Sequence, residues 1–217
     1  MRKTAIIFDH DGTLVDSIEA VIICTNLILV KNGYRKHSAD EILKGFPYPT
    51  EERFQYHTGT TASSVSAKMA EDFYSEMHTI GIDYLKVYPG ISAALDLLVD
   101  YGYSMGMVSN NQGIFIRKAA AKLQYSYDLE IILGEENVKA NKPSPDGLLQ
   151  ACAGLAARPE NCWYIGDTIS DHEAAHAAKM KSGLVTWGVQ TEAVLSASGA
   201  DALFRTPADM ADYFKPA

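Results

Sequence analysis

Two aspartates stand two positions apart near the start of the chain, in the segment FDHDGT at residues 8–13. Asp9 and Asp11 follow directly after a short apolar run, where a buried strand is expected to end. Side chains alternate in direction along a strand, so the two carboxylates can share one side while His10 points away as a bystander. One carboxylate can attack phosphorus as a nucleophile, and the other can protonate the leaving oxygen.

Three further polar segments could join this pair. The segment SNN at 109–111 and the segment GDTISD at 166–171 each follow an apolar run, and Lys142 stands shortly before a helical pattern. Ligands of open α/β sheets bind at the carboxyl ends of the strands, so we expect these segments to meet at one edge. A single such segment is typical of an ordinary turn. Four of them on one edge indicate a functional site.

The carboxylates in this set require a counter-charge. Asp9, Asp11 and Asp167 would lie close together, which is unfavourable unless a cation lies between them. Oxygen ligands without Cys or His spacing suit Mg²⁺ rather than Zn²⁺, and Mg²⁺ is commonly held by one or two carboxylates together with a substrate phosphate. The pattern therefore predicts a magnesium site.

Groups that could bind phosphate complete the set. Ser109 and Asn110 supply hydrogen-bond donors for phosphate oxygens, and Lys142 supplies a positive charge. Phosphoryl transfer depends mainly on positioning and charge stabilisation, which such groups provide. Together the residues predict a phosphoryl-transfer site.

The elements that must position these residues alternate between strand and helix. Apolar runs that predict strands buried on both faces occur at 4–8, 103–108, 162–165 and 183–187, with weaker candidates at 131–133 and 202–205. Helical patterns occur at 91–98, about 145–157 and about 171–181. This alternation predicts an α/β fold with a doubly wound, Rossmann-like parallel sheet.

A long helical stretch interrupts the alternation after the first strand. Helices are predicted at 18–31, 39–44, 51–57 and 61–80, with no convincing strand among them. We therefore expect a core domain of residues 1–16 and 85–217 and a small all-helical cap domain of residues 17–84. The alternative is one continuous α+β domain.

With these segments in order, the chain resembles the haloacid dehalogenase superfamily of phosphohydrolases. The motifs that carry the resemblance are DHDGTLVDS, the Ser of VSNN, the Lys of NKPSPD, and IGDTISD. The chain is most similar to the branch with a helical cap inserted after the first strand, which comprises phosphoglycolate-phosphatase-like and β-phosphoglucomutase-like proteins.

The resemblance implies a role for each motif residue. Asp9 would be the nucleophile and Asp11 the general acid/base, and an aspartate in this second position is typical of phosphate rather than halide chemistry. The metal ligands would be Asp9, the main-chain carbonyl of Asp11 and Asp167, supported by Asp171. Ser109 and Asn110 would bind the phosphate, and Lys142 would steady the nucleophile and the phosphate charge.

Specificity residues are less clearly marked. Thr13 could donate near the leaving group or serve as a turn hydroxyl. Phe46 and Arg53 lie in the part of the helical insert that faces substrate in the family. Arg53 could meet a second anionic group of the substrate, or it could be an exposed helix arginine. Given the acidic charge of the chain, the insert's aromatic residues favour a cap core over a base-stacking surface.

The overall composition narrows the function further. The 217 residues carry a formal net charge of -8, which is unlike a binder of nucleic acid or of anionic membranes. Three cysteines without regular spacing predict reduced thiols, and no apolar run is long enough to span a bilayer. His172 and His176 share a helix face but lack zinc-like partners. We expect a cytoplasmic protein that acts on a small phosphorylated metabolite.

Three functions stay open at this point. The first is a Mg²⁺-dependent phosphatase of phosphoglycolate-phosphatase type. A phosphomutase of β-phosphoglucomutase type would use the same core residues but needs extra substrate-holding residues. A non-catalytic regulatory protein on the same fold would be favoured by a missing motif residue, and none is missing.

Overall fold

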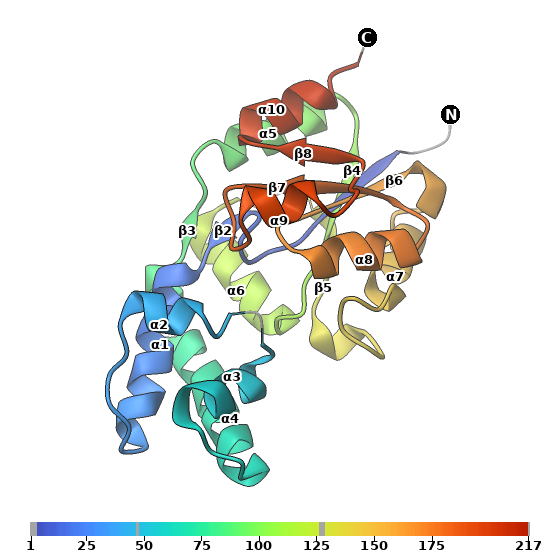
Figure 1. The fold of residues 1–217 in the computed structure, drawn as a ribbon. Coiled ribbons are helices and arrows are strands. Elements are labelled where there is room, and N and C mark those ends of the chain that lie inside the picture. The colour runs from blue at the N-terminus through green and yellow to red at the C-terminus, as the bar shows by residue number, and fades with distance from the viewer. Residues whose placement is uncertain (1–3, 47, 126–128, 217) are drawn as a thin grey trace. The chain divides into compact units, whose positions relative to one another are not determined.

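The computed structural model describes residues 4–46, 48–125 and 129–216. The chain divides into two compact units: Met1–Asp16 with Lys86–Ala217, and Ser17–Leu85 (Figure 1). The first unit contains a six-stranded sheet, and the regular elements described in the second are all helices.

The first unit is built on a sheet with the strand order β5-β4-β1-β6-β7-β8, in which every pairing is parallel. This order places β1 at the centre, between β4 and β6, and confirms the predicted doubly wound α/β fold. The strands are β1 (Ala5–Phe8), β4 (Ser104–Val108), β5 (Leu129–Leu133), β6 (Cys162–Gly166), β7 (Lys181–Val185) and β8 (Ala202–Phe204).

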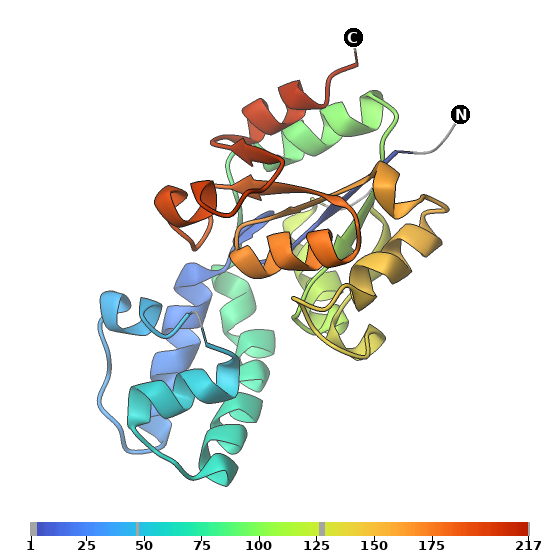
Figure 2. The same ribbon diagram turned by 45° about the vertical axis from the view of Figure 1, so that its right-hand side comes forward.

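Helices cover both faces of this sheet (Figure 2). On one face, α5 (Ile91–Asp100) packs against α10 (Pro207–Tyr213). On the other, α7 (Asp146–Gly154) packs against β4 and β5, and α8 (Ile169–Ala177) packs against β6 and β7. The remaining helices of the unit are α6 (Gly113–Leu123), α9 (Glu192–Ser196) and the short 3-10 turns η2 (Glu135–Asn137) and η3 (Pro159–Asn161).

The strands are buried because their side chains are apolar on both faces. All four residues of β1 are fully buried, and every residue of β4 and β6 is buried. A core cluster joins β1 and β6 to α7 and α8, and it contains Ile7, Leu148, Tyr164 and Ala174. Burial on both sides is what a continuous apolar run requires, and the strands predicted at 4–8, 103–108 and 162–165 form within one residue of those bounds.

The helix ends differ from the prediction for an identifiable reason. The alanine-rich segments predicted helices running to about 157 and about 181, whereas α7 ends at Gly154 and α8 at Ala177. Ala156 and Lys179 adopt left-handed backbone conformations, with φ of 52° and 59°, and these turn the chain toward the next strand. Composition does not reveal such turns when the residue is not glycine.

Three further details were not predicted. The helix α6 was not anticipated, and two-residue strands β2 (Val15–Asp16) and β3 (Lys86–Val87) pair antiparallel in a small second sheet. The strand expected at 183–187 is β7, which ends at Val185. Trp187 lies beyond it, and its indole Nε1 donates a hydrogen bond to the carbonyl of Thr13 at 3.0 Å.

The second unit contains four helices and a 3-10 turn among its described residues: α1 (Ile18–Lys31), α2 (Ala39–Leu43), α3 (Thr50–Thr58), α4 (Ser63–Thr79) and η1 (Gly81–Tyr84). The four predicted helices are confirmed within two residues at each end. Phe54 of α3 and Phe73 of α4 are buried, and their rings meet edge to face with centroids 6.0 Å apart. Ser38 starts α2 with a capping box that includes Glu41.

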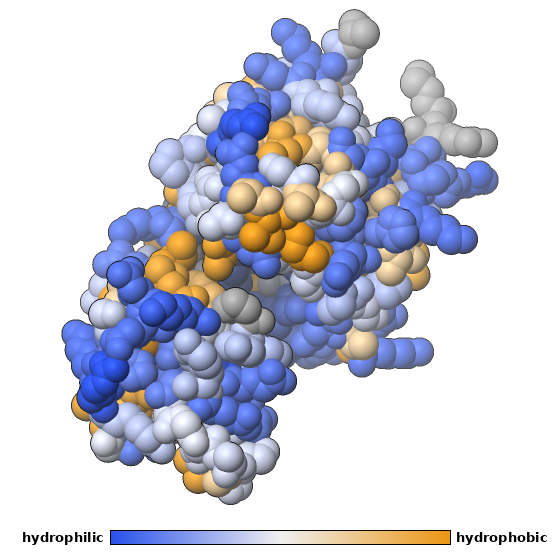
Figure 3. Space-filling model, viewed as in Figure 1, coloured by the Kyte–Doolittle hydropathy of each residue, from blue (hydrophilic) through white to orange (hydrophobic). Residues whose placement is uncertain are grey.

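One face of the molecule is largely polar. Figure 3 shows a mostly hydrophilic face that is interrupted by small apolar areas on both units. Over the residues that the structure describes, no helix is both long and apolar enough to cross a membrane.

Adjacent leucines on α7 allow the core packing to be tested. Leu148 is fully buried in the core cluster, and its neighbour Leu149 is 43% exposed. We expect Leu148→Ala to lower the free energy of unfolding by ~2–5 kcal/mol, because it leaves a cavity. The matched Leu149→Ala should cost below about 1 kcal/mol.

Both tryptophans, Trp163 and Trp187, belong to the first unit. Urea denaturation followed by tryptophan fluorescence therefore reports on this unit specifically. Equal losses for the two leucine variants would contradict the packing described here.

Candidate active site

The strand β1 delivers Asp9 to the carboxyl edge of the sheet. The backbone N–H of Asp9 donates to the carbonyl of Ile165 in β6 at 2.8 Å, so the ladder holds the residue directly beside that strand. The chain then turns sharply, and the N–H groups of Thr13, Leu14 and Val15 all point to the carbonyl of His10. This turn fixes the aspartate motif as a rigid loop.

Gly12 allows this loop to approach Asp167. Gly12 has a φ of 80°, and a Cβ atom at this position would collide with the carboxylate of Asp167. Only glycine meets both requirements, the left-handed backbone and the absence of a side chain. The loops after β1 and β6 are thereby packed against each other.

Lys142 lies at the centre of the site. Its Nζ is 2.8 Å from Oδ1 of Asp9 and 2.6 Å from Oδ1 of Asp171, and all three side chains are buried. The same ammonium donates to the hydroxyl of Tyr164 at 2.8 Å. Burial alone would lower the pKa of Lys142, but the attraction of Asp171 and Asp9 raises it well above its usual value. Lys142 is therefore a permanent cation between two carboxylates.

Asn110 holds the backbone of Lys142 in place. Its side-chain Oδ1 accepts from the N–H of Lys142 at 2.8 Å, and its Nδ2 donates to the carbonyl of Lys142 at 3.2 Å. This reciprocal pair ties the loop after β4 to the lysine loop. The side chain of Asn110 thus positions Lys142, a role that the sequence did not predict.

Asp171 is fixed at the first turn of α8. Its Oδ2 accepts from the N–H of Thr168 at 2.9 Å and from the hydroxyl of the same residue at 2.6 Å, while Oδ1 faces Lys142. Both oxygens are therefore occupied by donors from the protein. Gly166 makes room for this carboxylate, because a Cβ there would collide with it.

Asp167 is buried among other negative charges. Its Oδ2 accepts from the N–H of Val189 at 2.7 Å, and the hydroxyl of Thr13 lies 3.5 Å from its Oδ1. Burial, together with the charges of Asp171 and Asp9, raises the pKa of Asp167 well above its usual value. The described part of the chain has no ion pair to Asp167, so this carboxylate has the least compensated charge of the three.

Asp9 has a similarly raised pKa. Burial raises it most, Lys142 opposes the effect, and Asp171 adds to it, which brings the pKa of Asp9 to about 6. The group is consequently a carboxylate at neutral pH, but only because the lysine is next to it.

The three acids fit a divalent cation. Oxygens of Asp9, Asp167 and Asp171 lie within 4.8 Å of one another, and this is the one such group found among the described residues. Buried carboxylate oxygens are the donors that Mg²⁺ prefers, and a cation would offset the mutual repulsion that raises two of the pKa values. The residues present therefore suit the predicted metal.

Asp11 lies outside this group of carboxylates. Its Oδ2 accepts from Nδ2 of Asn111 at 3.1 Å, and Nδ1 of His10 lies 3.1 Å from the same oxygen. Its side chain is 31% exposed, whereas the clustered acids are buried. The predicted metal contact of Asp11 is through its main-chain carbonyl and stays a prediction.

His10 is fully buried below the loop. Its ring packs against the rings of Phe115 and Tyr125, with centroid distances of 6.4 Å and 6.1 Å. The ring also contacts the carboxylate of Asp11, which the alternation of side chains along a strand did not predict. His10 is thus a core residue that reaches a site residue.

Ser109 ends β4 at the same edge. It is buried, its N–H donates to the carbonyl of Leu133, and its hydroxyl oxygen accepts from the N–H of Asn111 at 3.1 Å. The structure therefore brings together Asp9, Lys142, Asp167 and Asp171, with Ser109 and Asn110 on the neighbouring loop.

Comparison with known proteins identifies the family. A model of haloacid dehalogenase-like hydrolases matches residues 6–185. This range includes all the site residues from Asp9 to Asp171. The chain belongs to this family. The predicted family and hydrolase class are thereby confirmed.

Named relatives support the predicted branch of the family. Phosphoglycolate phosphatase of Nitrosococcus oceani is 27% identical over 191 residues, which cover 84% of this chain and 84% of that protein. N-acetylmuramic acid 6-phosphate phosphatase of Pseudomonas aeruginosa is 24% identical over 214 residues, covering 98% and 95%. The crystal structure of a haloacid dehalogenase-like hydrolase from Bacteroides fragilis has a TM-score of 0.86 and 29% identity, covering 94% of this chain and 98% of that one.

The helical unit of this hydrolase contains a buried arginine. Arg53 is 8% exposed, and its guanidinium carbon lies 4.7 Å from the ring centroid of Phe73 and 6.0 Å from that of Phe46. Its Nε and one Nη are buried without a hydrogen-bond partner, and burial lowers its pKa to about 10. The alternative of an exposed helix arginine is therefore wrong.

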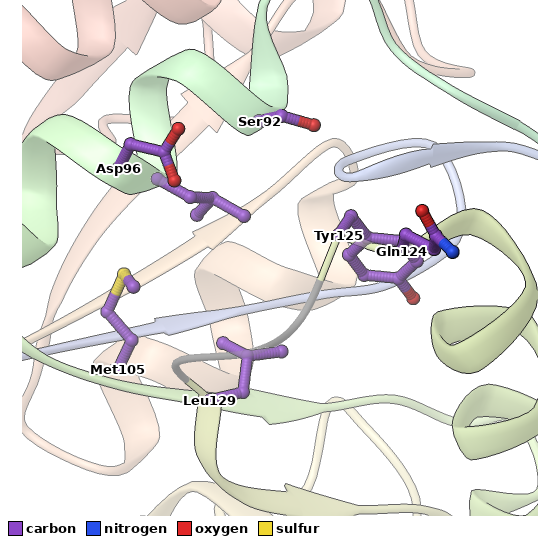
Figure 4. A pocket seen from close by; sticks show the side chains of 7 residues that line it. Ser92, Asp96, Met105, Gln124, Tyr125 and Leu129 are labelled. Carbon is purple, nitrogen blue, oxygen red and sulfur yellow. The ribbon is translucent and has the colours of Figure 1, made fainter.

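A small cavity lies elsewhere in the first unit (Figure 4). Its volume is about 40 Å³, and none of its lining residues belongs to the site. It is lined by Ser92, Leu95, Asp96, Met105, Gln124, Tyr125 and Leu129. A space of this size holds a water molecule but not a metabolite.

The two candidate histidine ligands of zinc have other surroundings. His172 faces the hydroxyl of Ser182 at 2.9 Å, and the rings of His172 and His176 are 6.2 Å apart. Within the described ranges, neither histidine belongs to a group of three metal-binding side chains.

The charge of Asp167 should destabilise the metal-free protein. The pKa of Asp167 is higher in the folded than in the unfolded chain, so its carboxylate lowers stability as pH rises through the folded value. We expect Asp167→Asn to raise the free energy of unfolding by ~1–3 kcal/mol at pH 8 in the presence of a chelator. The gain should shrink as pH falls, because the wild-type group then takes up a proton and loses its unfavourable charge.

The exposed Glu173→Gln on the same helix as Asp171 is the matched control, and it should change stability little. Urea denaturation at several pH values provides the measurement. A loss of stability in Asp167→Asn at pH 8 would show that this charge is fully compensated.

Proposed function

We propose that this chain is a Mg²⁺-dependent phosphoric monoester hydrolase that acts on a small phosphorylated metabolite through an aspartyl-phosphate on Asp9. The observation that carries the proposal is the buried carboxylate of Asp9, held ionised by Lys142 beside two further acids. Relatives that are named as phosphatases support the same chemistry.

Asp9 would act as the nucleophile. Its Oδ1 is paired with Lys142, which fixes the side chain and keeps it ionised at neutral pH. Lys142 is itself held by Asp171 and Tyr164, and the Tyr164 hydroxyl donates to the carbonyl of Val108 at 2.7 Å. A nucleophile that is fixed in this way needs little reorganisation before attack.

Phosphate oxygens would be bound at the end of β4. Ser109 lies there with its hydroxyl, and Asn110 orients the lysine loop through its amide. The positive charge of Lys142 would also stabilise the negative charge of the transferred group.

Magnesium would be held by Asp9, Asp167 and the main-chain carbonyl of Asp11, with Asp171 beside them. When bound, the metal would neutralise phosphate charge so that an anionic carboxylate can approach phosphorus. Thr13 and the N–H of Val189 orient the carboxylate of Asp167 for this role.

Asp11 would be the general acid and then the general base. It lies two residues after the nucleophile, on the same rigid loop, and is partly exposed, as a group that exchanges protons with substrate and water must be. Protonation of the leaving oxygen is needed for phosphate esters of ordinary alcohols.

Substitution of the nucleophile tests the mechanism. We expect Asp9→Asn to abolish release of phosphate from an aryl phosphate, because an amide does not form the aspartyl-phosphate. Wild-type turnover should require Mg²⁺ and stop in the presence of a chelator. Phosphate release by the purified proteins provides the measurement, and tryptophan fluorescence checks that the variant is folded.

Unchanged turnover in Asp9→Asn would contradict the mechanism. Turnover by the wild type that persists in the chelator would contradict the proposed metal requirement while leaving the nucleophile intact.

We further propose that the helical unit selects substrates with a second anionic group, and that Arg53 binds this group. A buried cation without a carboxylate partner is costly to maintain. The described residues provide no ion pair to Arg53, and its guanidinium lies over the faces of two aromatic rings. An anion from the substrate would satisfy its unpartnered nitrogens, as the carboxylate of phosphoglycolate could.

A substitution that keeps the aliphatic stem tests this role. We expect Arg53→Met to lower kcat/KM for 2-phosphoglycolate by about 10- to 100-fold, which corresponds to the loss of a charged hydrogen bond. Turnover of 4-nitrophenyl phosphate, which has no second anionic group, should change by less than about twofold. The exposed Arg35→Met in the same unit is the control for loss of a positive charge.

Equal losses on both substrates would show that Arg53 stabilises the helical unit rather than selecting the substrate. Thermal denaturation of the variant separates these outcomes, because removal of an uncompensated buried charge should not lower stability.

A further inference from the structure

The carboxylate of Asp11 is contacted by two residues that the proposed mechanism does not use. Asn111 donates to Oδ2 of Asp11 at 3.1 Å, and His10 lies against the same oxygen. We infer that Asn111, supported by His10, is a positioning residue that sets the direction of the Asp11 carboxylate for proton transfer. The inference rests on the proposed role of Asp11 as the general acid/base.

Contacts with residues other than Asp11 already fix Asn111. Its side-chain Oδ1 accepts from the N–H of Gln112 at 2.8 Å, which determines that Nδ2 is the end directed toward the carboxylate. Its own N–H donates to the hydroxyl of Ser109, and its carbonyl accepts from the N–H of Glu135 at 3.0 Å. The amide is therefore held by its backbone and by its side chain.

The loop after β5 supports this arrangement. Gly134 lies so close to the Asn111 loop that a Cβ atom would be 2.7 Å from the carbonyl oxygen of Asn111 and would collide with Gly113. The N–H of Gly113 in turn donates to Glu136 at 2.9 Å. The position of Asn111 is thus set from β5, a strand that contributes no side chain to the reaction.

His10 contacts Asp11 from the buried side of the loop. The ring is fully buried between Phe115 and Tyr125, so it moves little. Its Nδ1 is 3.1 Å from Oδ2 of Asp11, close enough to limit rotation of the carboxylate, although the ring nitrogens lack an aligned hydrogen bond. His10, the residue that follows the nucleophile, thereby restricts the orientation of the Asp11 carboxylate.

The orientation of Asp11 matters in both half-reactions. An oxygen of Asp9 bonds to phosphorus as the bond from phosphorus to the leaving alcohol breaks, and the alcohol takes the proton of Asp11. Water then attacks the phosphoryl group, Asp11 takes a proton from that water, and Asp9 and phosphate are released. A carboxylate that rotates freely would meet these proton positions less often.

The need for the acid depends on the leaving group, which makes the inference testable. An alkyl phosphate needs protonation of its poor leaving group, whereas 4-nitrophenyl phosphate does not. We expect Asn111→Ala to lower kcat for an alkyl phosphate by about 10- to 100-fold, a part of what general acid catalysis supplies. KM should stay within about twofold.

With 4-nitrophenyl phosphate, the first turnover should keep its wild-type rate in Asn111→Ala, and only the later hydrolysis of the aspartyl-phosphate should slow. Rapid mixing separates the initial burst of 4-nitrophenol from steady turnover. A burst that slows as much as the alkyl reaction would overturn the inference, because Asn111 would then act on attack itself. A rise in KM alone would assign Asn111 to phosphate binding and would also overturn it.

A double-mutant cycle links the effect to Asp11. In the Asp11→Asn background, Asn111→Ala should cause no further loss with the alkyl phosphate. A full additional loss there would contradict the inference. If Asp11→Asn alone leaves the alkyl reaction unchanged, the proposed acid/base role has failed instead, and the two failures are distinguishable.

Variants at His10 test its share of the effect. His10→Asn keeps a nitrogen near the place of Nδ1 and should retain most of the alkyl activity, whereas His10→Leu should reduce it with the same leaving-group dependence. Gln150→Ala, which removes an amide from the surface of α7, is the control and should match the wild type. Thermal denaturation of each variant checks folding. Wild-type activity of His10→Leu with the alkyl phosphate would contradict the supporting role of His10 and leave Asn111 as the positioning residue.

Discussion

The ammonium of Lys142, shared between two buried carboxylates, is the interaction on which the site depends. Asp9 and Asp171 come from different elements, β1 and the start of α8, and both meet the same nitrogen within 2.8 Å. The charge of Asp9 depends on this cation, because burial disfavours the ionised form and Lys142 opposes that effect. Asp9 therefore depends on Lys142 for its charge as much as it depends on β1 for its position.

Much of the surrounding structure holds this lysine in place. Asn110 fixes its backbone, Tyr164 accepts its third donor contact, and Thr168 saturates the far oxygen of Asp171. Glycines at 12 and 166 leave the space that lets the loops close around the acids. These contacts join the ends of three neighbouring strands, β4, β1 and β6, and the central position of β1 in the parallel sheet is what brings those ends together.

The acids also show how function and stability oppose each other here. Asp167 is buried with a raised pKa, which means that its charge is unfavourable in the folded, metal-free chain. A protein selected for stability alone would place a neutral side chain at this position. The cost is explained if the group serves a cation, since the same charge density that destabilises the fold creates affinity for a divalent metal. Under the proposed function, Arg53 in the helical unit would be the corresponding case for an anion.

The sequence by itself determined most of the elements and most of the residues that gather at the candidate site. Continuous apolar runs such as 4–8 are buried on both faces only in a covered parallel sheet, and the positions of Asp9, Lys142 and Asp167 relative to those runs placed them at one edge. Only the tertiary structure decided which groups meet. It directs Asn110 to the backbone of Lys142, Asn111 and His10 to Asp11, and Arg53 into an aromatic core. All of these contacts depend on the detailed course of the backbone, and those of Asn110 and Asn111 also join residues far apart in the chain. Apolar periodicity indicates which face of an element is buried, but it does not indicate which polar groups a given side chain contacts.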